Sequence, residues 1–345
     1  MRTLKISLAV AALAVVAGIA YVAQQGESAG ANIVSAAEKF ISSLNADQKK
    51  QAMYAFDSDE RFNWHFIPLQ DAKTRKYTRK GLPMEEMTAD QKKAALALIK
   101  AGLSESGNIA VTTIMSLEAI LLEQEGPKSA MVRNPGWYFF TIFGTPSKTG
   151  KWGWRVEGHH LSMNFTMQGT QVVSSTPCFF GANPAQIKDG PNAGKRILPD
   201  AEDYAIALFK SLDDGQKNAA HQAKHFDEPG ARLKRPKMEK AVGLSAAKMT
   251  NAQQDTLIKV INAYVGRMAP DVAKEELRQV NDAGIDKIHF AFSGSPEQGK
   301  GYTYRLQGPT FVCEFLNVQP DSSKKKNPAN HIHSCWRRTT GDFGL

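Results

Sequence analysis

Cysteine is scarce in this chain. Only Cys178, Cys313 and Cys335 occur among its 345 residues. The odd number excludes complete pairing, although an exported protein could join two of the three in a disulfide. All three lie in strand-like sequence, which favours small buried side chains. We therefore predict three buried free thiols.

Long apolar runs are absent beyond the N-terminus, so nothing there is apolar enough to span a bilayer. At the N-terminus, Arg2 and Lys5 precede an uncharged stretch from Ile6 to Ala23, and Ala29-Gly-Ala31 then gives a small-x-small cleavage pattern. We predict that residues 1–31 are an export signal and that the protein is periplasmic or extracellular. The alternative is an uncleaved N-terminal anchor, which would then be the only contact with a membrane.

Signatures of phosphate and nucleic-acid binding are also missing. The net charge of +9 is scattered, and the densest run, Lys324–Lys326, is typical of a solvated loop. No nucleic-acid motif accompanies it, so no nucleic-acid partner is expected.

His221 and His225 have the spacing of a zinc-protease helix, but Gln222 stands where the catalytic glutamate belongs, which favours a surface helix.

An internal repeat is the strongest positive signal. The segments from Phe143 to His160 and from Ser293 to Thr310 match without a gap at an offset of 150 residues. The identical residues in the two copies are Gly144, Pro146, Arg155 and Gly158 in the first, and Gly294, Pro296, Arg305 and Gly308 in the second. The first copy carries His159 and His160 where the second carries Pro309 and Thr310. This difference predicts one composite site rather than two equal ones.

Both copies place helices before strands. Thr88 with Gln91 and Thr250 with Gln253 form capping boxes, and apolar residues follow each box at helical spacing. Further helices are predicted over 107–123 and 271–281. Strand-like segments then cover 137–143, 153–167 and 170–180 in the first copy, and 287–292, 302–318 and 331–337 in the second.

The predicted fold is therefore α+β. It is a tandem duplication in which each half has helices followed by about three antiparallel strands, and a pseudo-twofold axis relates the halves. The predicted organisation is an export segment over 1–31, a first repeat over 32–180, a Gly- and Pro-rich linker over 181–199 and a second repeat over 200–345.

Several blocks resemble the bacterial domain-of-unknown-function family number thirty-five hundred, which groups uncharacterised exported proteins. The resemblance covers roughly 40–345, and the blocks occur in the family's order. They are Phe62–Pro68, Gly102–Gly107, Trp152–Phe165, Phe180–Pro184 and Asn330–Arg337. Cys335 departs from the family pattern, which usually has an aliphatic residue there, so a shared role for this thiol is not expected. The resemblance implies no particular activity.

Four histidines are candidate metal ligands. His331 and His333 are two apart on a predicted strand, so they share a face and could chelate one ion. His159 and His160 are adjacent, so on a regular strand they face opposite ways and only one would join the site. Two exposed histidines on an edge strand are the alternative for the His-x-His pair. Three histidine ligands with an open position would suit catalysis by Zn, Cu or Fe.

Two further residues are catalytic candidates. Glu157 shares a strand face with Arg155 and His159, and it could orient a ligand or act as a general base. His65 lies among aromatic residues in one of the family blocks, although such a histidine is more often packed and hydrogen-bonded. The sequence thus favours an exported metalloprotein, and within that class a metal-dependent enzyme that acts on an unknown small molecule. A non-catalytic ligand-binding or scaffold protein and a metal-free hydrolase with a histidine base are the alternatives.

Overall fold

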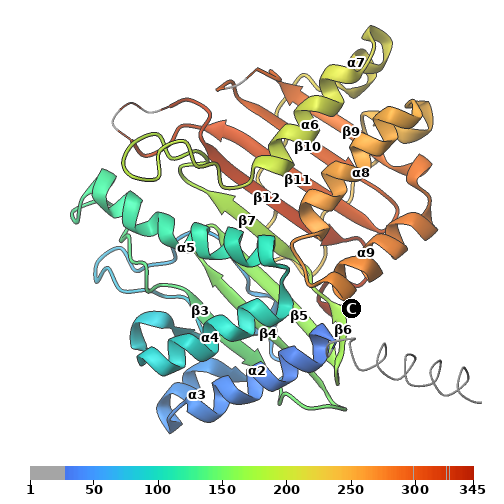
Figure 1. The fold of residues 1–345 in the computed structure, drawn as a ribbon. Helices are drawn as coiled ribbons and strands as arrows, with labels where there is room; N and C mark the ends of the chain where they lie inside the picture. The colour runs from blue at the N-terminus through green and yellow to red at the C-terminus, as the bar shows by residue number, and fades with distance from the viewer. Residues whose placement is uncertain (1–27, 298, 324, 326) are drawn as a thin grey trace, which may run out of the picture.

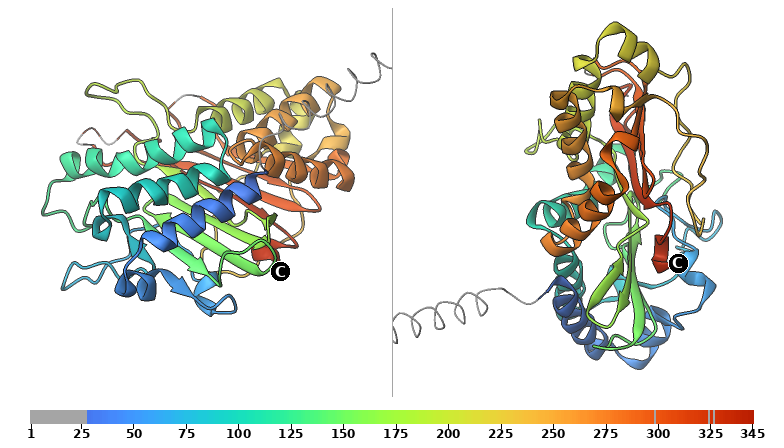
Figure 2. Two further views of the ribbon diagram at one scale, coloured as in Figure 1. Left: turned by 60° about the horizontal axis from the view of Figure 1, so that its bottom comes forward. Right: turned by 90° about the vertical axis from the view of Figure 1, so that its right-hand side faces the viewer.

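A single continuous sheet runs through both halves of the chain. The computed structural model describes residues 28–297, 299–323, 325 and 327–345. Among these residues the sheet has twelve strands, with β1-β3-β4-β5-β7-β12-β11-β10-β9-β8 as its main order, while β2 pairs with β3 and β6 with β5. The long helices lie on one face of this sheet, and loops and the C-terminus lie on the other (Figures 1 and 2). The protein is therefore a mixed α+β fold.

Among the described residues, each half begins with two helices, continues with one or two short strands and two more helices, and ends with the longer strands. The helices are α2 (Ala29–Ser43), α3 (Ala46–Ala52), α4 (Ala89–Gly102) and α5 (Glu105–Glu125), then α6 (Pro199–Ser211), α7 (Asp214–Ala220), α8 (Asn251–Val265) and α9 (Pro270–Ala283). The strands of the first half are β1 (Met53–Tyr54), β2 (Leu82–Pro83), β3 (Phe139–Phe143), β4 (Lys151–Gly158), β5 (Leu161–Gln168), β6 (Gln171–Ser174) and β7 (Cys178–Ala182). Those of the second are β8 (Leu244–Ser245), β9 (His289–Gly294), β10 (Tyr302–Gln307), β11 (Phe311–Gln319) and β12 (His331–Arg338).

Local sequence signals explain where the helices begin. The predicted capping boxes are confirmed at the starts of α4 and α8, where Thr88 and Thr250 accept from the backbone of Gln91 and Gln253. In each box the glutamine side chain also accepts from the N–H of the threonine. These bonds satisfy helix N–H groups that have no partner inside the helix.

Three strand predictions were wrong in their boundaries. Residues 153–167 and 302–318 each form two strands joined by a two-residue turn, at His159-His160 and Pro309-Thr310, and 170–180 is broken between β6 and β7. Strand-forming residues continue on both sides of each turn, so the pattern alone does not reveal it. The predicted helix through His221 and His225 is also wrong. α7 ends before His221, whose backbone bridges to Phe292 of β9, and His225 lies in a loop.

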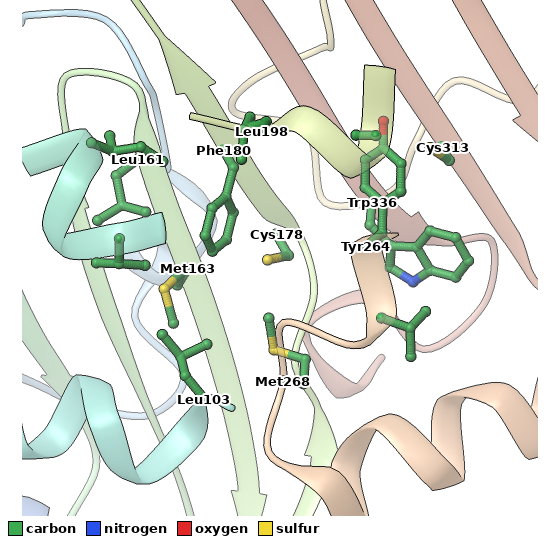
Figure 3. Close-up of a cluster of buried hydrophobic side chains, with 14 of the residues drawn as sticks. Leu103, Leu161, Met163, Cys178, Phe180, Leu198, Tyr264, Met268, Cys313 and Trp336 are labelled. Carbon is green, nitrogen blue, oxygen red and sulfur yellow. The ribbon is translucent and has the colours of Figure 1, made fainter. Parts of the chain in front are cut away.

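The hydrophobic core crosses the boundary between the halves. The main buried cluster joins the helices to the helix-facing side of the sheet, and it includes Met163 and Phe180 as well as Tyr264 and Trp336 (Figure 3). The three cysteines are buried and free, which confirms the prediction for them. Because β7 pairs antiparallel with β12, the two halves share backbone hydrogen bonds and core together.

The predicted export segment lies mostly outside the described residues. Its last residues, 29–31, form the first turn of α2, where Ala29 donates its N–H to Asp271 at 2.9 Å. The boundary predicted after residue 31 therefore falls inside a helix. Within the described part of the chain, no helix has the length and apolarity that a membrane crossing requires.

Candidate metal centre

Three histidines from distant parts of the sequence meet on the loop-covered face of the sheet. His331 and His333 share the face of β12 that also carries Cys335, and Cys335 packs in a small cluster away from the helices. His160 lies in the turn between β4 and β5. Nε2 of His160 is 2.9 Å from Nε2 of His331 and 3.2 Å from Nε2 of His333. One ligand atom from each of the three lies within 4.8 Å of the other two.

These separations suit a metal ion. A tetrahedral zinc with nitrogen ligands at 2.0–2.1 Å keeps neighbouring ligand atoms about 3.3 Å apart. Burial, together with the neighbouring histidines, holds the pKa of His160 well below its usual value and lowers the pKa of His331 to about 2. These imidazoles are therefore neutral, which is the form that binds metals. Histidines from both halves could hold one metal ion here.

An unusual backbone at His160 brings its ring to β12. This residue has a φ of 62°, which few residues other than glycine adopt. Its N–H donates to the Phe66 carbonyl at 2.7 Å, and its carbonyl accepts from the Gly181 N–H at 2.8 Å. Two hydrogen bonds thus hold the turn in this conformation, and strained backbone of this kind is common at functional sites.

Because Gly181 has no side chain, the His160 ring can occupy the space beside it. It lies on β7, between the turn and β12, and pairs with His333. A Cβ atom at this position would lie 3.0 Å from Cδ2 of His160 and 2.7 Å from the Ile332 carbonyl. A side chain here would therefore push the ring away from the other two histidines.

The ring of His333 is oriented by an outer hydrogen bond. Nδ1 of His333 donates to the Glu228 carboxylate at 2.5 Å, and Gln319 donates to the other oxygen of that carboxylate at 2.8 Å. When Nδ1 of His333 carries the proton, its Nε2 presents a lone pair towards the cluster. Such outer partners are usual around metal-binding histidines.

His159 lies beside the cluster rather than in it. Its ring stacks on that of His160 with the centroids 3.8 Å apart. Its Nδ1 pairs with the buried carboxylate of Glu118 on α5 and lies 3.2 Å from a guanidinium nitrogen of Arg133. Burial lowers the pKa of His159, whereas Glu118 opposes that shift. The two rings stack because a turn, not a regular strand, carries them.

Glu157 lies in a separate buried ion-pair network. Its oxygens are 3.0 Å from Arg79 and 3.2 Å from Arg155, and one of them accepts from the His65 N–H at 2.9 Å. The three charged side chains are 2% exposed or less. Both carboxylate oxygens are thus engaged, which is typical of a structural charge pair.

His65 is also held by backbone contacts. Its Nδ1 accepts from the Phe66 N–H at 2.9 Å, and its carbonyl accepts from Arg79 at 3.0 Å. Burial and the charge of Arg79 lower its pKa to about 4. The Phe66 ring contacts both His65 and His333, with centroids 5.2 Å from each. His65 therefore stabilises the loop that borders the three-histidine cluster.

The described structure defines the protein as an α+β fold with a three-histidine cluster on the sheet face opposite its helices. The chain belongs to the family described as "Protein of unknown function (DUF3500)", whose model matches residues 26–345. No curated protein and no solved structure is significantly similar to it.

Proposed function

We propose that this protein is an exported metalloprotein that binds one divalent metal ion through His160, His331 and His333. The observation that carries the proposal is the convergence of three imidazole rings, one of which is oriented by a carboxylate. Zn, Cu or Fe suits such a set of nitrogen ligands. The proposal that the protein is exported rests on the N-terminal sequence alone, from Arg2 to Ala31.

The site has features that suit catalysis as well as binding. Three histidines would leave a fourth coordination position, and a zinc ion held by them would lower the pKa of a bound water to about 7. His160 and His333 are buried, whereas His331 is partly exposed and the Glu228 side chain is 42% exposed. A small substrate would therefore approach from the side of His331 and Glu228.

We further propose that the fold arose by tandem duplication and that a pseudo-twofold axis passes through the β7–β12 pair. The order β3-β4-β5-β7 in the first half repeats as β9-β10-β11-β12 in the second. Side-chain contacts repeat too: Gln48 donates to Gln91 at 3.0 Å, and Gln216 donates to Gln253 at 3.0 Å. A crystal structure in which a twofold rotation fails to superpose 40–180 on 205–340 would contradict the duplication.

Metal analysis of the purified mature protein tests the metal proposal. We expect close to one Zn, Cu or Fe per chain by plasma mass spectrometry, or the same stoichiometry when the metal-stripped protein is titrated with Zn²⁺. A protein that neither contains nor takes up any of these ions would overturn it.

Replacing Glu228 by glutamine should weaken metal binding about 10–100-fold, since outer partners of metal ligands contribute that much to affinity. Glutamine keeps the size of the side chain but removes the charge that orients His333. The exposed neighbour Asp227 supplies the matched control Asp227→Asn. Competition with a chromophoric chelator measures both variants, and equal affinities would exclude this role for Glu228.

A further inference from the structure

The backbone at the start of β12 is held by a side chain. β11 pairs with β12 in register up to Asn317 opposite Ile332, and the register then shifts so that Gln319 lies opposite His331. Val318 is the extra residue of this bulge, and a bulge disrupts the local ladder. The His331 N–H donates instead to Oδ1 of Asn317 at 3.1 Å.

The amide of Asn317 is fixed from its other end. Its Nδ2 donates to the Glu202 carboxylate on α6 at 3.0 Å. The same carboxylate accepts from the Tyr302 hydroxyl at 3.0 Å and from Arg196 at 3.1 Å. Asn317 and Tyr302 are 5% and 2% exposed, so this chain of hydrogen bonds runs through the protein interior.

The corresponding place in the first half contains no such network. Tyr302 pairs with Asn317 across β10 and β11, just as Trp152 pairs with Met167 across β4 and β5. Counted back from the helix ends at Leu212 and Leu44, Glu202 on α6 corresponds to Val34 on α2.

The three residues of the first half are all buried and apolar: Val34, Trp152 and Met167. The architecture therefore packs at this place without a buried carboxylate. Burying a charge is costly unless it is paired and hydrogen-bonded. A network that the fold does not need, and that ends on a candidate metal ligand, calls for a role at that ligand.

We propose that Asn317 and Glu202 are positioning residues for His331. Glu202 fixes the amide of Asn317, and Asn317 fixes the backbone of His331 at the bulge, so that its ring points at His160 and His333. Neither side chain belongs to the three-histidine cluster. The effect on metal affinity rests on the proposed function, whereas the hydrogen bond to His331 can be tested without any metal.

Replacing Asn317 by methionine, the residue at the first-half position, should lower Zn²⁺ affinity about 10–100-fold, as loss of an outer partner does. The triple variant Glu202→Val/Tyr302→Trp/Asn317→Met replaces the network by the three apolar residues of the first half. It also removes the Glu202 carboxylate, which Asn317→Met alone would leave without its amide partner and which could then destabilise the fold. It should unfold near the temperature of the wild-type apo-protein and still bind metal weakly.

A charge swap provides the rescue. In Glu202→Gln/Asn317→Asp the carboxylate introduced at position 317 still accepts from the His331 N–H, and the amide introduced at position 202 donates to that carboxylate. Both hydrogen bonds persist, and only the one between positions 202 and 317 reverses its direction. Affinity should return to within a few-fold of wild type. Tyr304→Phe is the control for losing a buried hydrogen bond nearby, because the Tyr304 hydroxyl donates to the Ala201 carbonyl and not to this network. It should leave affinity unchanged.

Two readouts keep this inference separate from the metal proposal. Hydrogen exchange at the His331 amide should accelerate in Asn317→Met and recover in the swap variant, with or without metal. If the wild type binds no metal, the metal proposal fails, and unchanged exchange in Asn317→Met would end the positioning role as well. If the wild type binds metal and Asn317→Met binds it equally tightly, the positioning role alone is wrong.

Discussion

Replacing His333 by alanine is expected to abolish stoichiometric metal binding while leaving a folded protein. The ligand set would fall to two histidines, and affinity should drop more than about 100-fold, since even outer partners contribute 10–100-fold. The ring of His333 packs against Phe66 and Phe179, so its loss should cost about 1–3 kcal/mol of stability. Metal content by plasma mass spectrometry and thermal unfolding of the apo-protein measure the two effects.

His221→Ala is the matched control, because this histidine is exposed at the end of α7 and far along the sheet from β12. It should keep its metal. Full metal retention in His333→Ala would end the three-histidine proposal. If His221→Ala alone loses its metal, the metal site lies at His221 and not at the three-histidine cluster. If His333→Ala loses both its metal and its fold, the metal has a structural role, because metal-binding energy is then folding energy.

The sequence predicted the pairing of His331 with His333 from strand periodicity alone. Their shared face follows from alternation of side chains, and the structure brings them to His160. Whether His159 or His160 joins the cluster could not be predicted, because the answer depends on a left-handed backbone conformation at His160 that no local sequence pattern indicates.

The outer partners of the site were not predictable either. Glu228 reaches His333 across 105 positions of sequence, from an irregular loop with no periodic pattern. Glu118 is one of several acidic residues on a long helix and shows its role only when α5 is packed against the sheet. Gly181 lay within a recognised family block, but its purpose requires knowing which ring it faces.

The order of helices and strands was predictable because capping boxes and β-rich segments are local signals. The single sheet was not, because the pairing of β7 with β12 joins residues about 150 positions apart. Glu157 shows the same limit. Its place on a strand with Arg155 was readable from the sequence, whereas its ion pair with Arg79, which comes from a distant loop, required the fold.

Replacing Glu157 by alanine should destabilise the protein by about 3–5 kcal/mol without removing the metal. Breaking a buried pair costs this much because an uncompensated charge stays behind. Arg79 would keep its hydrogen bonds to the carbonyls of His65 and Ile67, and Arg155 would keep its ion pair with Glu60, but the charge between the two guanidinium groups would be gone. Denaturant unfolding of the metal-free protein measures the loss.

The exposed ion pair of Glu275 with Arg278 on α9 provides the comparison for this buried one. Glu275→Ala should change stability little, since water screens exposed pairs. A Glu157→Ala variant as stable as wild type but deficient in metal would contradict the structural role and return Glu157 to the functional site. A variant that is destabilised yet holds a full equivalent of metal would place the carboxylate in the framework that carries the loop around His65, separate from the histidine cluster.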